Sequence, residues 1–229
     1  MEEILINSWE ELLKQLDDNE RINPLYRGVR NSEYNLTPKI GRPGAVKGGW
    51  SEFVERQVLF RFKLSAYSYV DDLNAEGHDT EWLQVGQHYG LPTRLLDWSF
   101  NPLVAAYFAV EGDSEGTDAA IYKYTNVPSV NTYMPDIFKI KEVAFLMPYS
   151  RTSRIAAQSG VFTVHNEPCN SYDDGAIKKL LIPNELRDQI KKKLSHFGIN
   201  HSTLFPDLGG IAAHLTWHIS SEELLDPDG

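Results

Sequence analysis

Residues 87–99 read Gln87-His88-Tyr89-Gly90-Leu91-Pro92-Thr93-Arg94-Leu95-Leu96-Asp97-Trp98-Ser99. Gly90 and Pro92 restrict the backbone of this stretch, and imidazole, phenol, guanidinium, carboxylate and hydroxyl groups are crowded around them. Polar chemistry concentrated in a rigid turn is typical of a binding or catalytic site. We therefore expect this stretch to fix the local fold and to carry part of a functional site.

Composition predicts one large domain. The chain has 229 residues, of which 41% are hydrophobic and 11% aromatic, enough to bury a large core. It has no apolar run long enough to cross a membrane, and its first residues, Met1-Glu2-Glu3-Ile4, lack the basic start of a signal peptide. The single cysteine, Cys169, leaves no internal disulfide. We expect a cytoplasmic protein that does not bind membranes.

Charge is distributed unevenly along the chain. The formal net charge is -10, which disfavours non-specific binding to duplex nucleic acid. The segment from Arg21 to Lys63 nevertheless has nine basic residues and three acids, whereas Ser65 to Asp118 has one arginine and ten acids. The basic segment could hold a polyanion such as a dinucleotide or a nucleic-acid strand. Alternatively, its charges are solvated surface groups.

Periodicity and turn residues predict an α+β fold in a single domain, with helices in the first half and a mainly antiparallel sheet in the second. Capping residues and apolar stripes predict helices at 8–16, 51–70, 80–89, 101–110, 184–197 and 206–219. Apolar and β-branched runs predict extended segments at 24–29, 33–40, 119–124, 143–147, 160–165 and 177–182. We divide the chain into an N-terminal helix at 1–20, the main domain at 21–219 and a frayed tail at 220–229.

A second motif, Tyr26-Arg27-Gly28, lies upstream. Together with the core from Gln87 to Trp98 it resembles the FRG domain, a family named for an aromatic-Arg-Gly triplet. The resemblance spans Pro24 to Leu215. Within it, Arg154 to Phe162 matches an Arg-x-x-x-Gln-x-Gly-x-Phe element, and Leu204 to Leu208 matches a further family element.

Arg27 is the first candidate site residue. A guanidinium held by Gly28 at a strand end can clamp a phosphate or a carboxylate through two hydrogen bonds. The alternative is an arginine paired with an acid such as Asp97, and Arg30 and Arg94 compete for the ligand-binding role. We expect Asp97 to orient one of these arginines rather than to act as a base.

His88 and Tyr89 end a predicted helix. A neutral imidazole there could hydrogen-bond a ribose or a base, and the phenol ring offers a face for stacking. Alternatively, His88 is satisfied by its own loop. Downstream, Gln158 beside a strand start can bind an amide, a base edge or a ribose hydroxyl. We expect the segments Gln87 to Ser99 and Arg151 to Gly160 to converge next to Tyr26-Arg27-Gly28. Arg27, His88, Arg94 and Gln158 should then lie within reach of one ligand.

A metal site is not predicted. His214 and His218 share a helix face, but the glutamate of a zinc-protease helix is absent. The sequence also lacks a glycine-rich phosphate loop ending in Lys-Ser/Thr and a Gly-x-Ser-x-Gly elbow. We therefore expect neither a metal cofactor nor kinase or serine-hydrolase chemistry.

The resemblance further implies a relation to ADP-ribosyltransferases, which take NAD as a substrate. Those enzymes begin with an arginine or histidine on an early strand that holds NAD. They continue through an aromatic and hydroxyl region around nicotinamide and end with a carboxylate- or glutamine-bearing turn. The resemblance thus implies catalytic roles for Arg27, His88 and Gln158. It implies NAD binding by Tyr26, Arg27, Gly28, His88, Tyr89, Thr93, Arg94, Asp97, Ser99 and Arg154.

Some FRG-domain proteins are linked to ADP-ribosylation of DNA bases and to toxin-antitoxin or phage-defence settings. The resemblance therefore implies single-stranded nucleic acid as the acceptor and an antitoxin as a partner. The carboxylate-x-Glu signature expected near Gln158 is absent, and the nearest acids are Glu142, Glu167 and Asp207. A second hypothesis is accordingly a non-catalytic module that senses a nucleotide or a nucleic-acid end. The acceptor base and the oligomeric state stay open.

Overall fold

Seven strands form one sheet in the computed structural model, which describes residues 1–17, 24–70, 78–112, 116–126, 136–148 and 156–221. The strands are β1 (Glu2–Leu5), β2 (Leu25–Val29), β3 (Leu95–Ser99), β4 (Ala119–Tyr124), β5 (Ala144–Leu146), β6 (Gly160–Val164) and β7 (Ile177–Ile182). Their order across the sheet is β1-β7-β4-β2-β3-β6-β5. β1 pairs parallel with β7, and all other neighbours in the sheet pair antiparallel.

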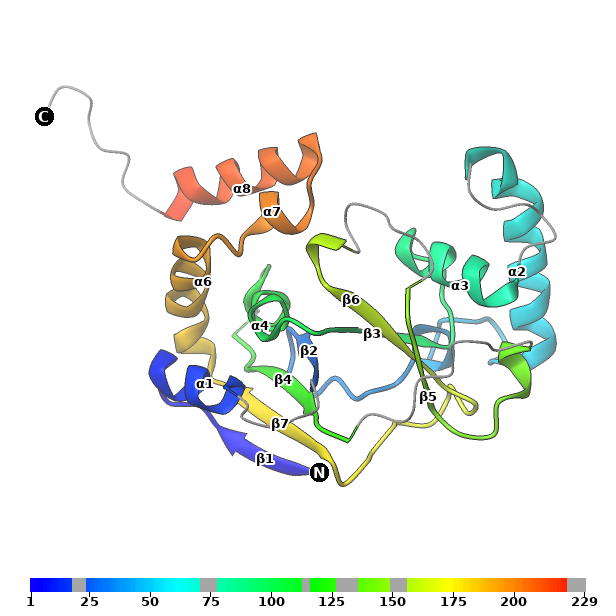
Figure 1. Cartoon of the computed structure of the whole chain (residues 1–229), viewed down its shortest axis with the longest axis horizontal. Helices are drawn as coiled ribbons and strands as arrows, with labels where there is room; N and C mark the ends of the chain where they lie inside the picture. The colour runs from blue at the N-terminus through cyan, green and yellow to red at the C-terminus, as the bar shows by residue number, and fades with distance from the viewer. Residues whose placement is uncertain (18–23, 71–77, 113–115, 127–135, 149–155, 222–229) are drawn as a thin grey trace, which may run out of the picture.

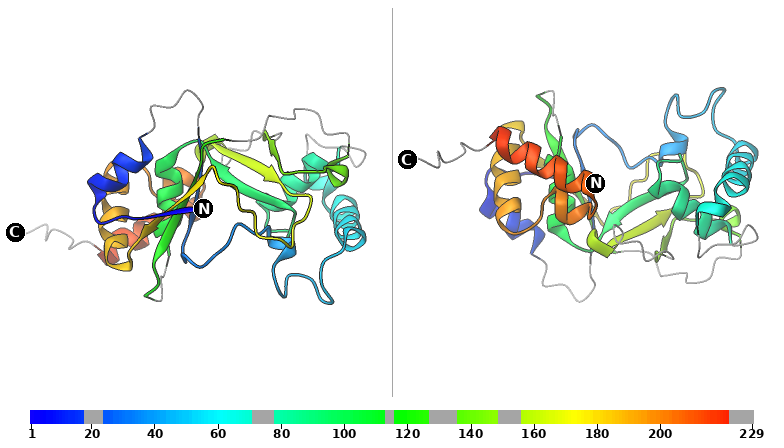
Figure 2. Two further views of the ribbon diagram at one scale, coloured as in Figure 1. Left: turned by 90° about the horizontal axis from the view of Figure 1, so that it is seen from below. Right: turned by 90° about the horizontal axis from the view of Figure 1, so that it is seen from above.

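The helices lie in two groups (Figure 1). They are α1 (Trp9–Leu16), α2 (Glu52–Ala66), α3 (Asp79–His88), α4 (Pro102–Val110), α6 (Arg187–His196), α7 (His201–Leu204) and α8 (Leu208–Ser221). Figure 2 shows α1, α6 and α8 at one end of the molecule and α2 and α3 at the other. No helix within the described ranges is long and apolar enough to span a membrane.

Local capping explains why the predicted helices begin and end where they do. The Ser8 hydroxyl accepts a hydrogen bond from the Glu11 amide at 3.1 Å, and α1 follows. The Asn101 side chain caps α4 by accepting from the Leu103 amide at 3.0 Å. Gly198, with φ +77°, follows the end of α6 in the left-handed conformation that glycine adopts readily. These helix boundaries agree closely with the sequence prediction.

The predicted order of elements was wrong. Three strands, β1, β2 and β3, come from the first half of the chain, so strands and helices are interleaved rather than separated. Strand β3 was not predicted, because residues 95–99 follow Gly90 and Pro92 and include a charged side chain, features that favour a turn. The extended segment predicted at 33–40 contains no strand. The fold class nevertheless holds, since the structure is an α+β arrangement around one mostly antiparallel sheet.

The core divides along the sheet into separate apolar clusters. One cluster joins α1, α4 and α6 to the β1-β7-β4 half of the sheet. A second joins α2 and α3 to β3, β5 and β6, and a third covers the opposite face of the sheet. In α2, Phe53, Phe60 and Leu64 are exposed. Only Glu55 and Leu59 of that helix are buried.

Gly28 sets how closely α4 approaches β2. A Cβ atom at Gly28 would lie 1.9 Å from the Ala105 carbonyl oxygen and 2.6 Å from the Ala109 amide nitrogen. Both are backbone atoms of α4 and cannot move aside as a flexible side chain could. The glycine of the Tyr26-Arg27-Gly28 motif is therefore required for helix packing.

We predict that Gly28→Ala destabilises the protein by about 3 kcal/mol or more, because the added methyl group forces α4 away from β2. Urea denaturation measures this change. Gly175→Ala is the matched control, since a Cβ there meets no atom within 4 Å. Equal stability of the two variants would show that α4 can shift at no cost.

Candidate functional site

A pocket opens where β2 and β3 separate. The two strands share a single register pair, Tyr26 with Ser99. Beyond it, β2 pairs only with β4 and β3 pairs only with β6. The space between them continues over α4 as a pocket of about 500 Å³, a size typical of small-molecule and cofactor sites. The sheet therefore supplies a cavity at its centre.

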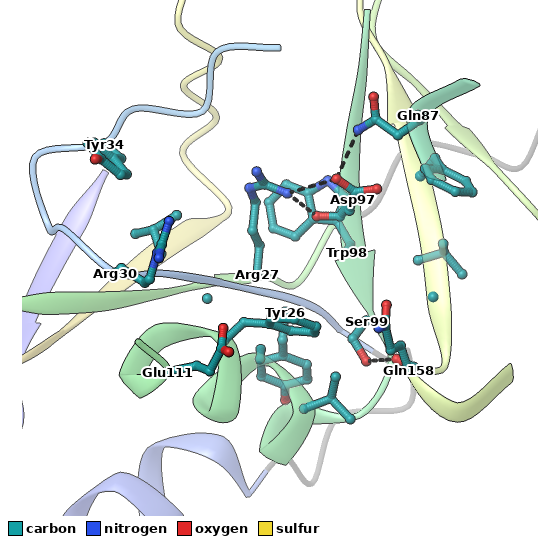
Figure 3. A pocket seen from close by; sticks show the side chains of 18 of the residues that line it. Tyr26, Arg27, Arg30, Tyr34, Gln87, Asp97, Trp98, Ser99, Glu111 and Gln158 are labelled. Carbon is teal, nitrogen blue, oxygen red and sulfur yellow. Dashed lines mark hydrogen bonds and ion pairs between the residues drawn. The ribbon is translucent and has the colours of Figure 1, made fainter. Parts of the chain in front are cut away.

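Arg27 bridges the two strands at this opening (Figure 3). Its Nη1 donates a hydrogen bond to the backbone carbonyl of Asp97 at 2.6 Å and lies 3.6 Å from the Asp97 carboxylate. Burial lowers the pKa of the Arg27 guanidinium, and the charge of Asp97 opposes that shift. An arginine keeps its charge at neutral pH in such a setting. The pocket wall thus carries a fixed positive charge.

Asp97 is held in turn by the motif around it. The Gln87 amide donates to the Asp97 carboxylate at 2.9 Å. Thr93, which is fully buried, donates its hydroxyl hydrogen to the Gln87 side-chain oxygen at 2.6 Å. Asp97 therefore orients Arg27, as expected. Thr93 was expected to bind NAD, but it supports Gln87 from within the protein and does not line the pocket.

Arg94 is not a pocket residue, and its predicted ligand role is wrong. Its Nη2 lies 2.7 Å from the Glu55 carboxylate, its Nε donates to the same group, and both side chains are 1% exposed. The Trp50 indole donates a further hydrogen bond to Glu55, and the guanidinium lies over the Phe138 ring. A buried arginine needs a buried carboxylate, and Glu55 of α2 supplies it. This pair fixes α2 against the start of β3.

Ser99 and Gln158 form the opposite end of the pocket. The Ser99 hydroxyl donates to the Gln158 carbonyl at 2.7 Å, and the Gln158 amide donates to the Leu204 carbonyl at 3.1 Å. Between Gln158 and β6, Ser159 has φ +47°, a left-handed conformation uncommon for a residue other than glycine. The two segments expected to meet, around Ser99 and around Gln158, do so, and both residues line the pocket with Arg27.

The remaining predicted residues divide into three groups. Tyr26, Gly28 and His88 line the pocket. Tyr89 does not line the pocket; the residue is 74% exposed, and its ring packs edge-on against His88. Arg154 lies outside the described residues, so its predicted role stays a prediction.

The basic segment from Arg21 to Lys63 is not one continuous surface. Arg27, Arg30 and Arg42 line the pocket. Other members act elsewhere: Lys39 donates to the Gly90 carbonyl, Arg56 to Glu52, and Lys63 to Asp79. Arg21 lies outside the described residues. Of the basic residues in this segment, three arginines therefore contribute positive charge to the pocket.

Glu111 is a site residue that the sequence analysis missed. It directly follows α4 and lines the pocket, and its carboxylate lies 3.2 Å from His201 Nδ1. None of the expected acids, Glu142, Glu167 and Asp207, is among the residues lining the pocket. Its position in the sequence could have identified it, because Glu111 is the first charged residue after α4, the apolar helix that packs on β2.

His165 lies at the end of β6 in the core behind the pocket. It is 2% exposed and bonds to the Thr163 hydroxyl at 2.9 Å. Burial lowers its pKa from 6.5 to about 3, and the charge of Arg27 contributes. The folded protein therefore keeps this imidazole neutral at pH values where the unfolded chain would protonate it.

We predict that Arg94→Met lowers the free energy of unfolding by about 3 kcal/mol or more, because the Glu55 carboxylate is left buried and unpaired. The double variant Glu55→Leu with Arg94→Met should recover stability relative to the single variant, since no buried charge remains. Chemical denaturation compares the two. A single variant as stable as the wild type would refute the structural assignment of Arg94.

The pH dependence of stability provides a second test. Because the pKa of His165 is lowered on folding, its contribution is complete above about pH 6.5. The contribution falls by about 1.4 kcal/mol per pH unit below that value, down to about pH 3. His165→Gln cannot take up this proton, so the stability advantage of the wild type should shrink from pH 7 to pH 4. A difference that stays constant with pH would contradict a neutral, buried His165.

Comparison with known sequences and structures adds one match. The model of the FRG domain family matches residues 23–118, which include both Tyr26-Arg27-Gly28 and the Gln87 to Ser99 motif. The match is shorter than the expected resemblance, which extended to Leu215. No curated protein and no solved structure matches the chain. Residues 23–118 therefore resemble an FRG domain, and the two motifs within them contribute to the strand separation, the Arg27 bridge and the pocket described above.

Proposed function

We propose that the pocket binds NAD and that the protein transfers the ADP-ribosyl group to a base of single-stranded DNA. One observation carries the proposal. One pocket is lined by Arg27 on an early strand, by Ser99 later in the chain and by Gln158 in the last of these three segments. This is the order of elements that the resemblance to ADP-ribosyltransferases implies, and it places a guanidinium, a hydroxyl and an amide within reach of one ligand.

The charge of the pocket suits a diphosphate. Arg42 is close enough to lower the pKa of Arg27 through its own positive charge. Two neighbouring guanidinium groups repel each other until an anion is bound between them. Arg27 is already engaged by Asp97, whereas Arg30 and Arg42 are more exposed at the pocket. We assign the diphosphate chiefly to Arg30 and Arg42.

The unpaired edge of β2 suits the nicotinamide carboxamide. A carboxamide presents one donor and one acceptor side by side, as a neighbouring strand does. Beyond Tyr26, β2 has no such strand on the side facing β3. Gly28 lies in this part of the pocket, where the absence of a side chain lets a ligand approach the backbone. Phe108 and Phe205 supply aromatic surface nearby.

The reaction needs little covalent help from the protein. The bond between C1′ of the ribose and the nicotinamide nitrogen breaks, and nicotinamide leaves with the electron pair. A nitrogen of the acceptor base then bonds to C1′ and loses its proton to water. Holding the dinucleotide in position and stabilising positive charge on the ribose lower the barrier. Asp97 and Glu111 are the carboxylates that line the pocket.

A nucleotide sensor is the second candidate function. This function is favoured by the chemistry of Gln158. Its side-chain amide cannot act as a base, and it donates a hydrogen bond to the Leu204 carbonyl. In this case the same arginines bind the nucleotide without turnover. We further propose a cytoplasmic protein that works in a toxin-antitoxin or phage-defence setting with an antitoxin partner, because an enzyme that modifies DNA bases needs restraint in its own cell.

We predict that the pure protein releases nicotinamide from NAD and does so faster with single-stranded DNA, as chromatography of the reaction would measure. Arg42→Gln should weaken NAD binding by about thirtyfold, the effect of losing one charge-assisted contact worth about 2 kcal/mol. Lys47→Gln is the matched control, because Lys47 lies in the same loop but outside the pocket.

The outcomes separate the two candidates. Release that depends on DNA supports the transferase. Binding of NAD without release supports the sensor. Absence of NAD binding, or equal loss in the Arg42 and Lys47 variants, would contradict both.

A further inference from the structure

Glu111 stands between two cavities. It lines the main pocket and also a smaller cavity of about 130 Å³ that α4 shares with α6, α7 and α8. Figure 3 shows its carboxylate directed from the end of α4 into the main pocket. Arg30 lies nearby, since its Nη1 is 3.1 Å from where a Cβ on Gly112 would be. The carboxylate and this guanidinium therefore border the same end of the pocket.

Helix stability does not explain an acid at this position. Glu111 is the C-terminal cap of α4, where the carbonyl groups of the last turn make the local field negative. A carboxylate is disfavoured at a helix C-terminus for that reason. Among the described residues, His201 is the partner of the Glu111 carboxylate. The side chains of Glu111 and His201 are 28% and 25% exposed, respectively.

His201 Nδ1 faces two competing groups. It lies 3.2 Å from the Glu111 carboxylate and 3.0 Å from the Tyr107 hydroxyl. If Nδ1 carries a hydrogen, it donates to Glu111. If Nδ1 is unprotonated, its lone pair accepts the hydrogen of Tyr107 and cannot bind a carboxylate. Nδ1 cannot donate a hydrogen bond to Glu111 and accept one from Tyr107 at the same time.

The buried tyrosine decides between these arrangements. Tyr107 is 2% exposed, and burial together with the charge of Glu111 raises its pKa, so the hydroxyl keeps its hydrogen. A buried hydroxyl needs an acceptor, and within the described part of the chain His201 Nδ1 is the acceptor in hydrogen-bond contact with it. Neutral His201 is therefore expected to carry its hydrogen on Nε2. Among the described residues, Glu111 is then left without a donor.

We infer that Glu111 is the carboxylate that the pocket presents to its ligand, and that His201 is the positioning residue that keeps it available. The inference rests on the proposed function for the identity of the ligand. A carboxylate next to a guanidinium fits the junction of a ribose and a phosphate, with the vicinal hydroxyls donating to Glu111 and the phosphate facing Arg30. Glu111 thus selects a ribose hydroxyl donor.

Protonation of His201 reverses the arrangement. An imidazolium donates from Nδ1 to Glu111, so the carboxylate is neutralised and held against α7. The charged and titratable groups around His201 are Tyr107 of α4, Glu111 directly after α4, Lys191 of α6 and His214 of α8. Ligand binding should therefore be weaker at acidic pH than at pH 8.

The first test is calorimetric titration of the full chain with NAD at pH 8. Glu111→Gln should lower the affinity by about tenfold or more, since a hydrogen bond to a charged acceptor is lost. Glu185→Gln is the matched control, because Glu185 is exposed and lies outside both cavities. A Glu111 variant that binds NAD within twofold of the wild type would overturn the inference while leaving the proposed function intact.

The second test isolates His201. His201→Gln offers an amide oxygen to Tyr107 but cannot take up a proton, so it should bind NAD at pH 8 and lose the weakening at pH 5.5. His196→Gln, an exposed histidine of α6, should keep the wild-type pH dependence. Because His88 also lines the pocket, the decisive quantity is the difference between the wild type and His201→Gln. Identical pH profiles would refute the role of His201.

A third measurement does not depend on NAD. Long-range nitrogen-15 NMR of the unliganded protein at pH 8 reports which ring nitrogen of His201 carries the hydrogen. An unprotonated Nδ1 supports the inference even if NAD proves not to be the ligand. A protonated Nδ1 donating to Glu111 would overturn it.

Discussion

The backbone carbonyl of Asp97 receives a hydrogen bond from the Arg27 side chain instead of from a neighbouring strand, and the pocket depends on this replacement. An unpaired, partly buried carbonyl is costly, so the two strands could not stay apart if nothing bridged them. A guanidinium can span the gap and still leave room for a ligand. The same group then lends the pocket its positive charge.

Two further contacts keep the strands in this position. The close approach of α4 to β2 at Gly28 holds one side of the opening, and the buried Arg94–Glu55 pair holds the other by fixing α2 against β3. Each side of the opening has its own apolar cluster. Of the two arginines in the motifs, Arg27 therefore lines the pocket and Arg94 is buried in the core, although both are followed by small or apolar residues in sequence.

Much of the fold and part of the site were predictable. Caps such as Ser8 and Asn101 and the apolar run of α4 have local causes, and local causes are visible in sequence. The convergence of Arg27, His88 and Gln158 on one pocket was also predicted correctly, from the polar chemistry of their segments. The strand character of residues 95–99 was not, because it depends on pairing with β6, and neither was the burial of Arg94, which depends on a partner in α2. Glu111 was missed because its importance arises from a contact with α7, about ninety residues away in the chain.

Hydrogen exchange of the backbone amides, with and without NAD, tests the central claim most directly. We propose that the ligand occupies the space where β2 and β3 separate. NAD should therefore slow exchange at residues 26–30 and 95–99, the two edges of that opening, and leave the distant amides of β1 and β7 unchanged. Protection confined to the small cavity beside α8, or no protection at saturating NAD, would contradict it.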